Sequence, residues 1–130
     1  LGNRETMVGT YMYMAPERIK NLPYTLVSDI WSVGISLMEC AYGGNPFIYG
    51  KKKNDKNEKL DFWVLSGYVI DDPPKLNRLE FSEDFCDFID CCLIKNPDER
   101  YNTEALLNHK FIQNYKNVSI SEFKNWLKSK

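Results

Sequence analysis

The sequence has almost no excess of either charge, and this limits the partners that it can attract. Its 17 lysine and arginine residues and 18 aspartate and glutamate residues leave a formal net charge of −1 at pH 7. Nucleic acids and acidic membrane surfaces attract strongly basic proteins, and this chain is not one. No apolar run approaches the roughly 18 residues that span a bilayer, and the first residues lack the pattern of a signal peptide. We therefore expect no nucleic-acid partner, no membrane partner and a cytoplasmic location.

The sequence also lacks the spacing of a metal-binding motif. Its four cysteines, Cys40, Cys86, Cys91 and Cys92, show no C-x-x-C pattern, and its only histidine is His109. This arrangement favours buried, reduced thiols in a cytosolic protein over metal ligands. We accordingly predict no metal site and interpret His109 as a structural residue.

The composition that remains is that of a folded, helical domain. Hydrophobic residues make up 43% of the 130 residues and aromatic residues 14%, which excludes a disordered tail. Helical patterns cover residues 28–42, 60–68, 82–93 and 119–130, whereas no strand pattern of any length appears. The sequence therefore predicts a mainly α protein.

The segment 28–42 has an unusually wide apolar face. Its apolar side chains cover roughly 220° of the helix surface, whereas a surface helix needs a stripe of only about 100°. We expect Ser28 to cap this helix, Gly43-Gly44 to end it, and neighbouring elements to cover it on several sides. The chain by itself is then expected to be marginally stable or to self-associate. The apolar residues are Ile30, Trp31, Val33, Ile35, Leu37, Met38, Cys40 and Ala41.

The other helices have clearer start signals. Ser82 is predicted to cap helix 82–93, and Asn102 is predicted to cap a helix that runs to His109. Helix 119–130 carries apolar residues within about 120° of one another, with lysines on the other side. The predicted buried face of helix 82–93 is Phe85, Phe88, Ile89 and Cys92, and the apolar face of helix 119–130 is Ile120, Phe123, Trp126 and Leu127.

Residues 8–18, VGTYMYMAPER, form the most specific motif in the chain. They resemble the end of a protein-kinase activation segment, which closes on an A-P-E tripeptide. SDIWSVG at 28–34 looks like the kinase helix F motif, and LIKNPDER and ALLNHKF look like the last elements of the same domain. Within the kinases, the chain most resembles the MAP kinase kinases. Five segments carry this resemblance through their residues and their order: APERI, SDIWSVGISLMEC, DDPPKL, FSEDFCDFIDCCLIKNPDER and FKNWL.

The resemblance implies the fold of the C-terminal part of a kinase C-lobe, with helices F to I and no N-lobe. Residues 1–23 would form the end of the activation segment and the P+1 loop, 24–118 the helical C-lobe, and 119–130 a C-terminal helix. The chain contains no G-x-G-x-x-G loop, no V-A-I-K lysine, no H-R-D and no D-F-G. The parent protein would use ATP and Mg²⁺, whereas this chain alone is expected to bind neither and to be inactive.

The resemblance also assigns roles within the motif at the start of the chain. Gly9, Thr10, Met12 and Tyr13 match the substrate-binding loop, and Thr10 would also support the catalytic loop. Thr6 matches an activating phosphorylation site, where a phosphate would order the segment by pairing with arginines. The family's other usual site falls on Gly2, which has no hydroxyl, so activation at two sites would need a residue elsewhere.

Further roles follow from the later motifs. Glu17 and Arg100 match the ion pair that anchors the A-P-E end, and Asp29 matches the aspartate that holds the catalytic loop. His109-Lys110-Phe111 departs from the usual His-Pro-Phe, which would alter the exit of the preceding helix. Phe123, Trp126 and Leu127 match a region that upstream kinases dock on, although these side chains would equally pack on the domain.

The function that the resemblance implies is that of a dual-specificity MAP kinase kinase. The parent protein would phosphorylate Thr and Tyr of a MAP kinase and would itself be activated by an upstream kinase. Two alternatives remain open at this point: another STE-group Ser/Thr kinase, and a pseudokinase or scaffold whose C-lobe recruits partners.

Overall fold

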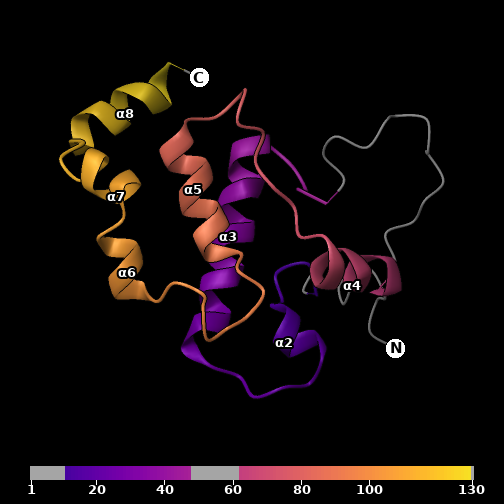
Figure 1. Ribbon diagram of the computed structural model, residues 1–130. Coiled ribbons are helices and arrows are strands. Elements are labelled where there is room, and N and C mark those ends of the chain that lie inside the picture. The colour runs from indigo at the N-terminus through magenta and orange to yellow at the C-terminus, as the bar shows by residue number, and fades with distance from the viewer. Residues whose placement is uncertain (1–10, 48–61, 130) are drawn as a thin grey trace, which may run out of the picture.

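A computed structural model describes residues 11–47 and 62–129 and is helical, without strands, in those ranges. This confirms the mainly α prediction. Figure 1 shows α3 and α5 side by side at the centre, with α2 and α4 on one side and α6, α7 and α8 along the other. None of the described helices is both long and apolar enough to cross a membrane. The helices are α2 (Pro16–Ile19), α3 (Leu26–Tyr42), α4 (Phe62–Asp71), α5 (Glu83–Cys92), α6 (Thr103–Leu107), α7 (Lys110–Tyr115) and α8 (Ile120–Lys128).

The long helix α3 begins before the predicted residue. Thr25 is its N-cap, and Ser28 lies at the third helical position, so the prediction of Ser28 as the cap is wrong. The Ser28 hydroxyl instead accepts a hydrogen bond from the Thr25 N–H at 3.4 Å and donates one to Glu17 at 2.7 Å. A serine can be the N-cap residue itself, or it can lie at the third helical position and accept the N–H of the N-cap residue. Residue type alone does not distinguish these two positions. The helix ends as expected at Gly43, whose φ of 68° suits glycine.

One side of α3 forms the centre of the core. Trp31, Ile35 and Met38 are completely buried there. Gly34 lies so close to α5 that an added Cβ would stand 2.8 Å from the Cβ of Cys92. The opposite side is open, because Val33 is 45% exposed. The expectation that α3 is covered on several sides is therefore only partly met: α5 and the segment around Tyr13 pack against it, whereas the side of Val33 is exposed.

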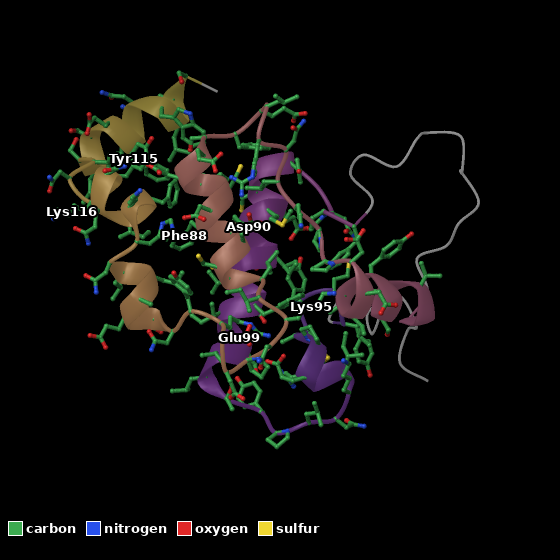
Figure 2. The ribbon with its side chains drawn as sticks, in the orientation of Figure 1. Phe88, Asp90, Lys95, Glu99, Tyr115 and Lys116 are labelled. Atoms are coloured by element: carbon green, nitrogen blue, oxygen red, sulfur yellow. The ribbon has the colours of Figure 1, made fainter. Side chains whose placement is uncertain are left out.

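Helix α5 has the predicted cap and nearly the predicted face. The Ser82 hydroxyl accepts a hydrogen bond from the Phe85 N–H at 3.4 Å. Phe88 and Ile89 are buried, and each such side chain contributes about 1.5–3 kcal/mol to stability. Cys86 is also buried whereas Phe85 is only partly so, because α5 packs against both α3 and α7 and buries more than one stripe. Figure 2 labels Phe88 on the side of α5 that faces α7.

The segment after α5 contains a helix that the sequence pattern did not separate. The Asn102 side chain accepts from the Ala105 N–H at 2.9 Å, which confirms the predicted cap of α6. However, α6 ends at Leu107, and His109 begins α7 by accepting from the Phe111 N–H at Nδ1, at 3.2 Å. His109 is thus the N-cap of α7, whereas the sequence predicts it at the end of the preceding helix. Its structural role is confirmed, and the ring also stacks edge-on to Phe88 with centroids 5.3 Å apart.

Helix α4 also differs from its prediction. Its predicted start falls at residue 60, outside the described residues, and it continues to Asp71 instead of stopping at Tyr68. The following Asp72-Pro73-Pro74 run ends it, because a residue that precedes proline avoids the helical region.

Candidate functional site

The predicted substrate-facing segment is only partly within the described residues. Thr6, Gly9 and Thr10 lie outside them, so their predicted roles stay predictions. Met12 and Tyr13 are described, and both are partly buried against the hydrophobic core.

Tyr13 is fixed to α3 at both its backbone and its side chain. Its hydroxyl donates a hydrogen bond to the Glu39 carboxylate at 2.5 Å, and its carbonyl accepts one from the Ser32 hydroxyl at 2.8 Å. The bond to Glu39, together with burial and the negative charge of Glu39, raises the pKa of Tyr13 above its usual 10.0. Next to it, the Asn45 amide donates to the Met12 sulfur. The segment is therefore held along α3, with a defined orientation for whatever it binds.

Glu17 and Arg100 form the predicted ion pair, and both side chains are buried. Arg100 Nη1 and Nη2 donate to the two Glu17 oxygens at 2.7 and 2.9 Å, which makes the pair bidentate. The two side chains are 0% and 2% exposed. The prediction of the pairing is thus confirmed, and the geometry is the one in which such pairs are strongest.

All five N–H donors of Arg100 have an acceptor. Besides the two bonds to Glu17, Nε donates to the Ile94 carbonyl at 2.7 Å, Nη1 to the Val27 carbonyl at 2.9 Å, and Nη2 to the Lys95 carbonyl at 3.2 Å. One side chain therefore joins the start of α3, the turn after α5 and the A-P-E segment. Full satisfaction of its donors is what makes burial of this charge tolerable.

The charge state of Glu17 depends on these bonds. Burial by itself would raise the pKa of the carboxyl group, but the hydrogen bonds from Arg100 and Ser28 outweigh it and hold the pKa below its usual 4.5. Glu17 is therefore ionised at neutral pH and remains paired. The resemblance identifies Glu17 and Arg100 but not Ser28, because the sequence pattern predicts Ser28 as a helix cap.

The turn that carries Arg100 is itself cross-linked. The Lys95 ammonium donates to the Asp71 carbonyl at the end of α4 at 2.6 Å, and the Asn96 side chain accepts from the Asp98 N–H at 3.2 Å. Figure 2 labels Lys95 on the side of this turn toward α4, and Glu99 near the start of α3. The turn formed by the KNPDER motif follows α5 and is thus hydrogen-bonded both to the end of α4 and to the A-P-E segment.

Asp29 lies apart from this buried network. It is exposed in the first turn of α3, where it accepts a hydrogen bond from the Tyr24 hydroxyl at 2.6 Å. This position suits an acidic residue, because the N-terminal end of a helix favours negative charge. Its predicted role as an anchor of the catalytic loop has no test among the described residues and stays a prediction.

The predicted docking residues lie on α8, far along the molecule from α2 and α4 (Figure 1). Ser119 and Glu122 form a reciprocal capping box at its start. Phe123, Trp126 and Leu127 are 55%, 54% and 52% exposed, so the interpretation that they pack on the domain is wrong for this structure. Phe123 and Trp126 stack on each other, with ring centroids 5.9 Å apart, and present a continuous apolar face.

Two residues that shape the site carry only a weak sequence signal. Ser32 and Glu39 orient Tyr13 from one face of α3, yet both read as ordinary polar positions of an amphipathic helix. Their seven-residue separation does place them on one face, two turns apart. That spacing was the only available signal, and it did not name the segment that they hold.

Comparison with known proteins agrees with the resemblance. A sequence model of the protein kinase domain matches residues 2–112. Mitogen-activated protein kinase kinase 1c of Physcomitrium patens is 40% identical over 116 residues, which are 88% of this chain and 33% of that protein. Mitogen-activated protein kinase kinase 3 of Arabidopsis thaliana is 45% identical over 108 residues, 82% of this chain and 19% of that protein.

An animal protein is similar over a comparable region. Dual specificity mitogen-activated protein kinase kinase dSOR1 of Drosophila melanogaster is 38% identical over 125 residues, which correspond to 83% of this chain and 32% of that protein. The chain therefore spans about a fifth to a third of the length of these relatives.

Proposed function

Because this chain belongs to the protein kinase domain family, we propose that it is part of a dual-specificity MAP kinase kinase. Such a protein phosphorylates Thr and Tyr in the activation loop of a MAP kinase, with ATP as the phosphoryl donor. The observation that carries the proposal is the 38–45% identity to proteins named MAP kinase kinases over more than four fifths of the chain.

In this proposal, Gly9, Thr10, Met12 and Tyr13 bind the segment of the substrate that follows the phosphorylated residue. The contacts of Tyr13 with Glu39 and Ser32 support the proposal, because they preset the path of this loop before the substrate arrives. A loop that already has its binding conformation loses less conformational entropy when the substrate binds, and it aligns the reacting groups. The buried Glu17–Arg100 pair would hold the other end of the loop in place.

ATP and Mg²⁺ belong to the proposal for the whole protein. They would supply the transferable phosphoryl group and neutralise its charge. None of the motifs that bind them occurs in these 130 residues, so we propose that the chain alone is inactive. Thr10 and Asp29 would support the catalytic loop from the side of this chain.

Activation would come from phosphorylation of Thr6 by an upstream kinase that docks on α8. The exposed apolar face of Phe123, Trp126 and Leu127 supports this part of the proposal, because burial of large aromatic side chains dominates many protein interfaces. Leu26 and Val33 are exposed seven residues apart on one face of α3, which supports the further proposal that this chain alone would self-associate unless other parts of the protein cover that side. A cytoplasmic location fits these partners.

The test uses the full-length protein that carries this chain and a folded MAP kinase as substrate. Tyr13→Phe removes only the hydroxyl that bonds Glu39, and Tyr115→Phe is the matched control because Tyr115 is exposed on α7, away from the residues proposed to bind substrate. We expect Tyr13→Phe to lower kcat/KM by about tenfold, since hydrogen bonds to charged groups contribute about 1.5–3 kcal/mol. The control should leave kcat/KM unchanged.

The same assay separates the alternatives. Phosphorylation of generic peptides but not of a folded MAP kinase would identify another STE-group kinase. Complete absence of phosphoryl transfer, with α8-dependent binding of a partner kinase, would identify a scaffold. Equal activity of the two tyrosine variants would contradict the proposed role of Tyr13.

A further inference from the structure

Three side chains with metal-binding atoms meet where α5 faces the start of α7. Asp87 and Cys91 are separated by four residues on α5, which places them on one face of that helix, one turn apart. His109 approaches from the N-cap position of α7. The Asp87 carboxylate, the Cys91 sulfur and the His109 ring offer one atom each, and these atoms all lie within 4.8 Å of one another.

The spacing is close to what one tetrahedral ion requires. With ligand bonds of about 2.0–2.3 Å, donor atoms around Zn²⁺ stand roughly 3.3–3.8 Å apart. The His109 side chain is buried and fixed by Phe88, whereas the Asp87 side chain is 59% exposed and has room to adjust. His109 Nε2 already lies 3.1 Å from the Asp87 oxygen. Small rotations of Asp87 and Cys91 would therefore complete the ligand set.

The donor types indicate which ion would bind. Thiolate and imidazole are ligands of Zn²⁺ and similar thiophilic ions, whereas Ca²⁺ and Mg²⁺ require oxygen ligands. We propose that Asp87, Cys91 and His109 form a three-ligand site for Zn²⁺ or a similar thiophilic divalent ion, whose fourth position is open to water. The Tyr101 hydroxyl, which interacts with the Cys91 thiol, would act as an outer-shell donor to the bound thiolate.

Binding at this site would change the start of α7. His109 Nδ1 accepts the Phe111 N–H, so the neutral ring carries its proton on Nε2, which donates to Asp87. The ion would displace the thiol proton of Cys91 to solvent, and the Nε2 proton would move to Nδ1. Nδ1 would then be a hydrogen-bond donor, so the Phe111 N–H would lose its acceptor and α7 would lose its N-cap. Loss of such a cap lowers affinity by only about fivefold, which a three-ligand site easily outweighs.

The test is titration of the full chain with Co²⁺, which replaces Zn²⁺ and reports a thiolate ligand through a near-ultraviolet charge-transfer band. Cys91→Ser removes the proposed sulfur ligand, and Cys40→Ser is the matched control because Cys40 is an exposed free thiol on α3. His109→Asn removes the ring while retaining a residue that caps helices well. Far-ultraviolet circular dichroism checks that each variant is folded.

We expect one Co²⁺ per chain with a thiolate band, and Zn²⁺ should compete for the same site. Cys91→Ser should abolish the band and lower affinity by more than about 100-fold, since even outer-shell losses cost 10–100-fold. Hydrogen exchange of the Phe111 amide should accelerate when Zn²⁺ is added. Absence of the band from the unmodified chain, or a band lost in Cys40→Ser but retained in Cys91→Ser, would overturn the proposal.

Discussion

Helices α5 and α8 have the same design in sequence but opposite surroundings in the structure. Each begins at a serine whose hydroxyl accepts a backbone N–H, at Ser82 and at Ser119, and each gathers its large apolar residues on one face. The face of α5 lies between α3 and α7, and Ile89 within it is completely buried. The face of α8 contributes no side chain to the core.

The difference shows what an amphipathic pattern does and does not specify. A pattern states which side of a helix avoids water, but it does not state what covers that side. For α5 the cover is in this chain, and for α8 it is not among the described residues. An uncovered face of stacked aromatic side chains is a feature of interaction sites, and the proposed docking of an upstream kinase depends on it. Substitutions in the two helices test whether they differ in their contribution to stability as they do in burial.

The largest effect should follow from removing Arg100, which holds the packed side of the molecule together. Arg100→Ala leaves the Glu17 carboxylate buried and unpaired and removes the donors for three carbonyl groups. We expect a loss of about 3–5 kcal/mol in the free energy of unfolding, measured by urea denaturation. Glu17→Gln should cost less, because Arg100 keeps its carbonyl acceptors. An equal or larger cost for Glu17→Gln would contradict this order of effects.

Truncation of one apolar residue in each helix compares the two faces directly. Ile89→Ala in α5 should lower the free energy of unfolding by about 2–5 kcal/mol, because it leaves a cavity in the core. Leu127→Ala in α8 should change it by no more than about 0.5 kcal/mol, because that side chain is 52% exposed. A destabilisation by Leu127→Ala comparable to that by Ile89→Ala would mean that α8 packs on the domain in solution.

Acid should weaken the packed side through Glu17. The folded state holds the pKa of Glu17 below its usual 4.5, so the stability from its ionised form is complete above that value. This stability is lost as the pH falls below 4.5 through the lowered pKa of the folded state. Urea denaturation of the unmodified chain and of Glu17→Gln at neutral pH and in acid measures the difference. The gap between them should narrow in acid, and a gap that stays constant would contradict the assignment.

The smallest effects should come from the two serine caps. Ser82→Ala should lower the global free energy of unfolding by about 1 kcal/mol, because α5 unfolds only with the core. Ser119→Ala removes a similar cap but should loosen only α8, which opens independently of the core. Amide hydrogen exchange distinguishes the two results, since the second variant should affect amides of α8 alone. Protection changes in α5 caused by Ser119→Ala would show that the helices are coupled.

Much of the fold was predictable because it depends on local signals. The caps at Ser82 and Asn102 and the end of α3 at Gly43 all follow from residue types that satisfy or terminate a helix. The errors arose where one residue type serves two purposes. The pattern predicts Ser28 as a cap, whereas in the structure it supports the Glu17 carboxylate. It predicts His109 at a helix exit, whereas in the structure His109 caps α7.

The candidate site was predictable only through motif resemblance. Glu17 and Arg100 are 83 residues apart, and no local pattern connects two residues at that distance. The roles of Glu39 and Ser32 required knowledge of which segment lies along α3. The convergence of Asp87, Cys91 and His109 gave no recognisable spacing, because the third ligand enters from the start of another helix.

The sequence by itself determined most of the helices, the caps at Ser82 and Asn102, and the family, since these depend on residue types and spacings that neighbours in the chain provide. The tertiary structure alone decided which apolar faces are covered, how Tyr13 is held, and that every donor of Arg100 has an acceptor. The physical reason is that burial and hydrogen-bond satisfaction are properties of contacts between distant segments. That is why α5 and α8, with closely similar patterns, became a core helix and an exposed one.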